Sequence, residues 1–202
     1  MRRMTKVALG AMALAVGIGS ASSFLVLNSN AAQTKAATGT VTYTISGAKE
    51  VTPTNAPAGT SAAFVTTYTS NKFQLTSGKY NTLTLKGYSG MNITSLVLSM
   101  RSNASAGAGK LSYSVDGGQA YVYLAGSASA GADFNTWGDN TTFGTAYRDV
   151  TFSLASPIVA TTSDLIFRID GTANSIYIQS YKLAWSKTIQ KRDSRNQFSR
   201  FK

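Results

Sequence analysis

Hydrophobic and polar residues alternate in short segments between residues 41 and 185. This period of two residues is typical of β-strands that bury one face, and no segment has the periodicity of a helix. Turn-forming Gly, Ser, Asn and Pro separate the segments at spacings of about ten residues. The predicted strands lie at Val41–Ser46, Ala63–Thr69, Lys72–Thr76, Asn81–Gly87, Ile93–Arg101, Lys110–Val115, Gln119–Leu124, Tyr147–Leu154, Leu165–Asp170 and Ser175–Trp185. They predict an all-β fold, and a single jelly-roll-like β-sandwich fits the uneven strands and long loops best.

The alternation also predicts which residues face the core. In Ile93–Arg101 the better core face contains Thr94, Leu96, Leu98 and Met100. The alternation in Ser175–Trp185 predicts two faces. One face contains Ile176, Ile178, Ser180 and Lys182, and the other contains Tyr177, Gln179, Tyr181, Leu183 and Trp185. Asp116-Gly117-Gly118 predicts a hairpin turn and Asp170-Gly171 a second turn, because glycine tolerates the positive φ that such turns need.

The start of the chain predicts export. Met1–Lys6 is basic, Val7–Leu27 carries no charge, and Ser29-Asn30-Ala31 is a small-x-Ala site. This is the pattern of an N-terminal secretory signal segment that covers residues 1–31 and is cleaved near Ala31. The apolar segment is also near the length that spans a bilayer, so an uncleaved anchor is the alternative, and it would be the only contact with a membrane. In either case the protein is expected to be secreted or on the extracellular face of the cell surface.

Composition and charge divide the remaining chain. There is no Cys, so a secreted domain must be held by its core alone. The net charge of +11 is concentrated at the two ends of the chain, and the body between them is nearly neutral. A specific nucleic-acid partner is therefore not expected. We predict a linker at 32–40, the sandwich at 41–185 and a basic, disordered tail at 186–202.

Most enzyme chemistries are excluded by residue type. The chain has neither His nor Cys, which removes the usual zinc sites, the Ser-His-Asp triad and thiol catalysis. A hydrolase would need two opposed carboxylates, and Asp133 with Asp139 or Asp149 is the pair that the sequence offers. We therefore expect a protein that is not an enzyme, with a glycoside hydrolase using that pair as the weaker alternative.

The segment Asp133–Asp149, which begins in the longest irregular stretch of the chain, holds the first candidate binding site. Phe134, Trp137 and Tyr147 offer aromatic faces there, and Asp139 and Asn140 offer hydrogen bonds. A sugar has an apolar C–H face and a rim of hydroxyl groups, so this set suits a glycan. Alternatively, Phe134 and Trp137 fold inward as a plug over the edge of the sandwich.

Two further groupings deserve a functional hypothesis. Asp133, Asn135 and Asp139 are oxygen ligands close in sequence, which suits a structural calcium ion, although they match neither the EF-hand loop nor the RTX nonapeptide. No other cofactor is expected. Tyr113, Tyr121 and Tyr123 flank the predicted hairpin and form a second candidate face, which either binds a sugar or only stabilises the sheet.

Three segments carry a family resemblance: Ile93–Gly118, Phe134–Asp149 and the ending SIYIQSYKLAW. They resemble a domain of secreted and surface proteins of gut-type Firmicutes and Bacteroidetes, whose architecture is similar to galactose-binding-like jelly rolls and non-catalytic carbohydrate-binding modules. The resemblance covers Val41–Trp185. It implies a ligand site built from loops and strand faces, and it assigns no catalytic residues.

These observations predict a secreted, non-catalytic β-sandwich that binds a glycan or cell-surface polymer. The alternative is a surface or matrix structural protein that adheres to itself or to other proteins.

Overall fold

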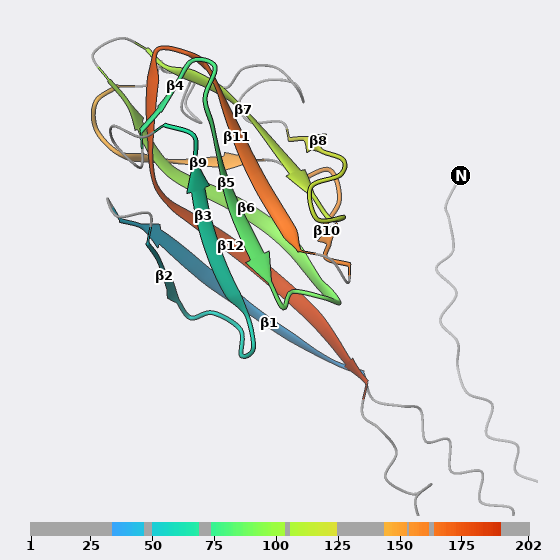
Figure 1. The fold of residues 1–202 in the computed structure, drawn as a ribbon. Helices are drawn as coiled ribbons and strands as arrows, with labels where there is room; N and C mark the ends of the chain where they lie inside the picture. Colours follow the sequence, from blue (N-terminus) through green and yellow to red (C-terminus); the bar gives the residue numbers. More distant parts are fainter. Residues whose placement is uncertain are drawn as a thin grey trace, which may run out of the picture. The chain divides into compact units, whose positions relative to one another are not determined.

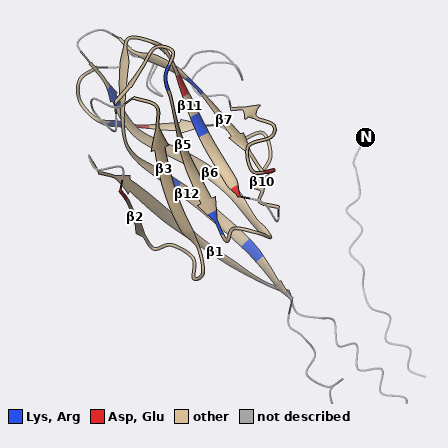
Figure 2. Cartoon of the chain, in the orientation of Figure 1, with Lys and Arg blue, Asp and Glu red and all other residues tan. Residues whose placement is uncertain are grey.

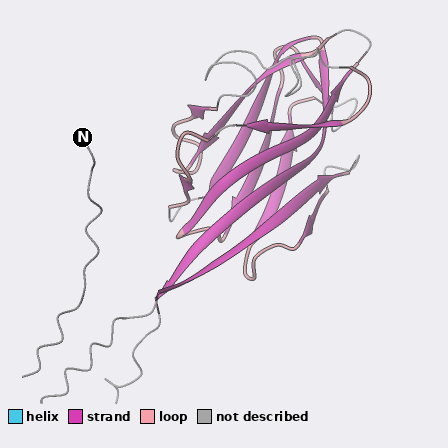
Figure 3. Cartoon of the chain, turned by 180° about the vertical axis from the view of Figure 1, so that it is seen from behind, coloured by secondary structure: helices cyan, strands magenta, loops and turns pink. Residues whose placement is uncertain are grey.

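The computed structural model describes residues 34–46, 50–68, 74–103, 106–124, 144–152, 154–161 and 164–190. All regular structure in these ranges is β-strand (Figure 3). The strands are β1 (Thr34–Ile45), β2 (Val51–Thr54), β3 (Ser61–Thr66), β4 (Gln74–Thr76), β5 (Tyr80–Lys86), β6 (Met91–Ser102), β7 (Ala108–Ser114), β8 (Val122–Tyr123), β9 (Arg148–Phe152), β10 (Ile158–Val159), β11 (Leu165–Ala173) and β12 (Ser175–Gln190). They form two antiparallel sheets packed as a sandwich (Figure 1). The predicted all-β class is therefore confirmed.

The order of the strands is that of a jelly roll. The first sheet is seven-stranded, with the order β10-β6-β12-β1-β2, and β4 and β9 pair at β12 and β6. The second sheet is five-stranded, with the order β3-β5-β11-β7-β8. The strands β5, β6 and β7 alternate between the two sheets, and so do β9, β11 and β12. One half of the sandwich therefore has the order β1-β12-β6-β9 and the other half has the order β5-β11-β7-β8. This is the double Greek key that the uneven strands and long loops predict.

The core lies between the two sheets and is built by side chains from both. Leu83, Leu85, Phe167 and Ile169 enter it from the five-stranded sheet and are at most 1% exposed. Val41, Tyr43, Leu96, Leu98, Tyr181 and Leu183 enter it from the seven-stranded sheet and are fully buried. Each fully buried side chain of this size contributes roughly 1.5–3 kcal/mol of hydrophobic stabilisation. The chain contains no cysteine, so the sandwich is held by this core and by strand pairing without disulfides.

A β-bulge in β12 corrects the predicted faces of that strand. Ile178 pairs with Met100, but Ser180 pairs with Ser99, so Gln179 is an extra residue on β12. Gln179 is exposed, and the strand changes phase there. Residues before and after it, Ile178 and Tyr181 among them, therefore enter the same core, although strict alternation placed them on opposite faces.

A second bulge lies further along the same ladder. Ala184 pairs with Ser95 and Trp185 pairs with Ile93, which leaves Thr94 as the extra residue on β6. Thr94 is exposed and Ile93 is fully buried. The prediction that Thr94 faces the core is therefore wrong, whereas the predicted burial of Leu96, Leu98 and Met100 is confirmed.

The strands β1 and β12 extend beyond the predicted bounds of the sandwich. Their ladder runs from Thr44 opposite Ser180 to Thr34 opposite Gln190. It thus includes most of the predicted linker and the first residues of the predicted tail. Hydropathy does not reveal this extension, because the paired residues are largely polar and the pairing rests on backbone hydrogen bonds. Trp185 lies over Gly39 here, where an added Cβ would be 2.9 Å from Cζ2 of the indole ring.

The predicted signal segment lies outside the described residues. Within the described ranges, no helix is long and apolar enough to cross a membrane. Charged residues are sparse and scattered on the described strands (Figure 2), which agrees with a nearly neutral body.

Candidate functional site

Polar and aromatic side chains gather on the outer face of the five-stranded sheet. Asp170 on β11 pairs directly with Tyr80 on β5 and with Lys110 on β7. Residues paired directly across antiparallel strands share a face, so these three side chains leave the sheet on the same side. This side is the one opposite to the core, since their strand neighbours Ile169, Asn81 and Leu111 are buried.

Arg168 occupies the next row of the same face. It pairs with Thr82 on β5 and with Ser112 on β7, and Ser112 in turn pairs with Tyr123 on β8. Ser112 is only 1% exposed although it lies on the outer face. In this row, the buried Ser112 therefore lies between the long cationic side chain of Arg168 and the half-exposed Tyr123.

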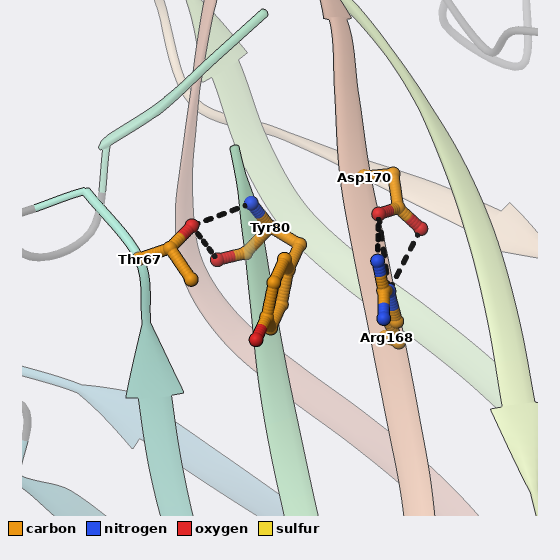
Figure 4. A network of polar contacts seen from close by, with 4 residues as sticks. All are labelled: Thr67, Tyr80, Arg168 and Asp170. Atoms are coloured by element: carbon orange, nitrogen blue, oxygen red, sulfur yellow. Dashed lines mark hydrogen bonds and ion pairs between the residues drawn. The ribbon is translucent and has the colours of Figure 1, made fainter. Parts of the chain in front are cut away.

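Arg168 and Asp170 form a fork on this surface (Figure 4). Nε of Arg168 donates to both carboxylate oxygens of Asp170 at 3.0 Å, and Nη2 donates to Oδ1 at 2.6 Å. The two residues are two apart in one strand, which is the spacing that puts side chains on the same face. These hydrogen bonds raise the pKa of Arg168, so the guanidinium stays charged. The side chains remain 32% and 31% exposed.

Two tyrosine rings flank the guanidinium group. Cζ of Arg168 lies 4.1 Å from the ring centroid of Tyr80 and 5.6 Å from that of Tyr121. Both distances are within the range of attractive cation–π contacts. Asp170 accepts from Nε and Nη2, and Nη1, which donates to no described residue, can donate to an acceptor of a ligand.

The tyrosines are held by their own backbone contacts. The hydroxyl of Thr67 accepts a hydrogen bond from the backbone N–H of Tyr80 at 2.9 Å and donates to its carbonyl at 3.0 Å, while the N–H of Thr67 donates to the same carbonyl at 2.9 Å (Figure 4). Tyr121 follows a loop that the Asp116 carboxylate organises by accepting from the N–H groups of Gln119 and Ala120. We call the set Tyr80, Tyr121, Tyr123, Arg168 and Asp170 the Arg168 face.

The structure divides the predicted tyrosine face. Tyr121 and Tyr123 lie on or beside the Arg168 face, but Tyr113 does not. Tyr113 pairs with Phe167, whose side chain is fully buried, and Tyr113 itself packs against the core. The expectation that Tyr113 lies across from the other two tyrosines on one surface is therefore wrong.

Arg168 and Asp170 were missed as site residues for a specific reason. Asp170-Gly171 has the composition of a turn, but both residues lie within β11, and Gly171 is buried beneath the carbonyl of Thr76. The glycine thus serves close backbone packing, since an added Cβ would be 2.2 Å from the oxygen of Thr76. The Arg-x-Asp spacing inside an alternating strand is the signal that indicates a paired surface fork.

The residues of the first candidate loop lie outside the described residues. These are Phe134, Trp137, Asp139 and Asn140, together with the predicted calcium ligands Asp133 and Asn135. Among the residues that the structure describes, there is no group of three or more metal-ligating side chains. Asp149, the alternative partner in the proposed carboxylate pair, lies on β9 opposite Ser99.

Tyr147, the described member of the loop set, lies against the other sheet. Cζ of Arg101 is 5.3 Å from its ring centroid and 3.9 Å from that of Tyr177. This second arginine, between two tyrosines, resembles the arrangement at Arg168. It differs in that Nη1 of Arg101 donates to the carbonyl of Ser102 at 3.0 Å and Tyr177 is only 8% exposed.

Comparison with solved structures shows a distant likeness in fold. The structure of a family two carbohydrate esterase from Cellvibrio japonicus is similar, with a TM-score of 0.35, 7% sequence identity, and coverage of 79% of this chain and 37% of that chain. The chain therefore spans little more than a third of that protein. No protein-family model and no curated protein matches the chain.

Proposed function

We propose that this protein is a secreted, non-catalytic glycan-binding module, and that the Arg168 face is its binding surface. The observation that carries the proposal is the guanidinium of Arg168 held by Asp170 between the rings of Tyr80 and Tyr121. Secretion rests on the pattern of residues 1–31 alone.

The chemistry of the face suits a sugar. A pyranose ring presents C–H groups that pack on aromatic rings, and the three tyrosines are each at least partly exposed. Its hydroxyl groups both donate and accept, which matches the carboxylate of Asp170 and the unoccupied Nη1 of Arg168. The carboxylate of Asp170 offsets the charge of Arg168, and Lys110 on the same face adds one positive charge. The face is pre-formed by strand pairing, so little side-chain entropy is lost on binding.

A single shallow site of this kind is expected to bind with a Kd between micromolar and millimolar, or about −4 to −8 kcal/mol. Glycan-array screening of the secreted protein tests the proposal, followed by calorimetry of the variants. Arg168→Lys keeps the charge but removes the planar fork, and Tyr121→Ala removes one ring. Both are expected to weaken binding at least tenfold.

Arg101→Lys is the matched control, because Arg101 also lies between two tyrosines but on the opposite sheet. It should leave the Kd unchanged. If Arg168→Lys binds like the unmodified protein while Trp137→Ala or Tyr147→Ala does not, the site is the aromatic loop and the Arg168 face is only structural. Absence of binding to any glycan would contradict the function itself.

A further inference from the structure

The strand β3 is an edge strand whose sequence contains none of the residues that usually protect an edge. It lies at the end of the five-stranded sheet, and in the described part of the chain β5 is its one strand partner. Its sequence, SAAFVT, contains no charge, no proline and no glycine. An edge of this kind presents backbone N–H and C=O groups that another strand can pair with.

The other edges of the described sheets are short or carry a charge or a proline. Beyond its pairing with β2, the edge of β1 runs from Thr34 to Val41 and contains the charged residue Lys35. The strand β4 has three residues. The strand β2 contains Pro53, which has no N–H to donate. The strands β8 and β10 have two residues each. The strand β9 begins with the charged residues Arg148 and Asp149. The strand β3 has six residues and none of these features, which makes it the edge best suited to accept another strand.

The side chains of β3 suit an identical partner. Phe64 and Thr66 are buried towards the core, while Ser61, Ala63 and Val65 are exposed on the outer face, Val65 by 53%. Antiparallel pairing of two identical strands about a two-fold axis sets these small, uncharged side chains against each other without like-charge repulsion. They carry no charge that would select the side chains of a foreign peptide.

We propose that β3 pairs with β3 of a second copy of this chain, in antiparallel orientation about a two-fold axis. The two five-stranded sheets then become one continuous ten-stranded sheet. A ladder of about this length buries less surface than the roughly 1,200–2,000 Å² of stable interfaces, so a weak dimer that forms only at high protein concentration is expected.

The pairing has a consequence that rests on the proposed function. A two-fold axis perpendicular to the sheet keeps both outer faces on the same side. The two Arg168 side chains are then separated by five inter-strand steps of about 4.8 Å, or roughly 24 Å along the joined sheet. A polymeric glycan could engage both faces, which increases avidity without any new contact.

Sedimentation velocity of the secreted chain over a range of concentrations tests the pairing. The unmodified protein should shift from monomer to dimer as its concentration rises. Val65→Lys places a charge at the two-fold contact and should remain monomeric. The matched control is Val159→Lys, because Val159 is 57% exposed on β10 and lies outside the proposed contact. It should dimerise like the unmodified protein.

Cross-linking gives a second measurement that does not depend on a disruptive substitution. The chain contains no cysteine, so one introduced thiol can form a disulfide only with another copy. Ala63→Cys or Val65→Cys should give a covalent dimer on mild oxidation, whereas Thr52→Cys on the β2 edge should not.

A monomer at millimolar concentration, or a Val65→Lys variant that still dimerises, would overturn the proposal. Glycan binding is measured separately on the Val65→Lys monomer, which should keep the single-site Kd. Loss of dimerisation with intact binding therefore contradicts only the pairing, and dimerisation without binding contradicts only the proposed function.

Discussion

The hydroxyl groups of Tyr43 and Tyr88 lie 2.6 Å apart inside the sandwich. Tyr43 comes from β1 and is fully buried, and Tyr88 follows β5 and is 2% exposed. Each phenol thus gives the other a hydrogen-bond partner where little water is available. The contact also joins β1 of the seven-stranded sheet to the segment that follows β5 of the five-stranded sheet.

Removing one of these hydroxyl groups should lower stability. Tyr88→Phe leaves the hydroxyl of Tyr43 without this partner, and the expected loss in the free energy of unfolding is about 1–3 kcal/mol. Urea denaturation measures it. The Tyr43→Phe/Tyr88→Phe double variant should lose less than the sum of the single variants, and strict additivity would mean that the hydrogen bond contributes nothing.

Stability should fall at alkaline pH. Burial raises the pKa values of Tyr43, Tyr88 and Tyr181, because ionisation of a phenol is unfavourable away from water. The pKa of each phenol is about 10 in the unfolded state and higher in the folded state. The stabilisation that the neutral phenols provide is therefore complete below pH 10 and is lost as the pH rises further. The melting temperature should therefore decrease steeply above pH 10. Absorbance titration near 295 nm should show these tyrosines ionising only on unfolding.

The contact between Gly39 and Trp185 should tolerate no side chain. An added Cβ at Gly39 would be 2.9 Å from Cζ2 and 3.0 Å from Nε1 of the indole, so the ring must move. We expect Gly39→Ala to cost about 1–3 kcal/mol, in the range of overpacked sites. Gly144→Ala is the matched control, because no atom of the described residues lies within 4 Å of its added Cβ, and thermal denaturation compares the two. Equal melting temperatures would show that the indole adapts freely.

The loop before Tyr121 should depend on the Asp116 carboxylate. Hydrogen bonds from Ser114, Gln119 and Ala120 lower the pKa of Asp116. Because the pKa of Asp116 is lower in the folded state, this stabilisation is present at pH values above the pKa of the unfolded state. It is lost as the pH falls through the pKa of the folded state. Asp116→Ala should therefore speed amide exchange at Gln119 and Ala120 near neutral pH, and it should weaken glycan binding through Tyr121. Unchanged exchange rates would show that the loop is held by other contacts.

The class of fold was predictable from the sequence because strand periodicity and turn residues are local properties. The assignment of residues to faces failed where a bulge inserted one residue. At Gln179 and at Thr94 the alternation continues in the sequence, but the strand changes phase in the sheet. No local pattern marks these positions, since the extra residue is defined by pairing with a distant strand. Strict alternation therefore predicts opposite faces for Ile178 and Tyr181, although both are buried.

The candidate site was predictable only in part, for a related reason. Tyr121 and Tyr123 were identified from their alternation, but the Arg168 face needs β5, β7 and β11 side by side. Tyr80 and Arg168 are far apart in sequence, and only the register of the sheet brings them together. The composition of Asp170-Gly171 predicts a turn, but both residues lie within β11 and Gly171 packs under a carbonyl group.

The pairing of β1 with β12 also determines how the sandwich would respond to force. The chain enters the ladder at Thr34 and leaves it at Gln190, directly opposite. Pulling these two residues apart would load the backbone hydrogen bonds one after another, as in unzipping, rather than all at once, as in shear. The β1–β12 seam should therefore open at low tension from that end. A load applied between Thr34 and a ligand on the Arg168 face would take a different path, because it must cross the core between the two sheets.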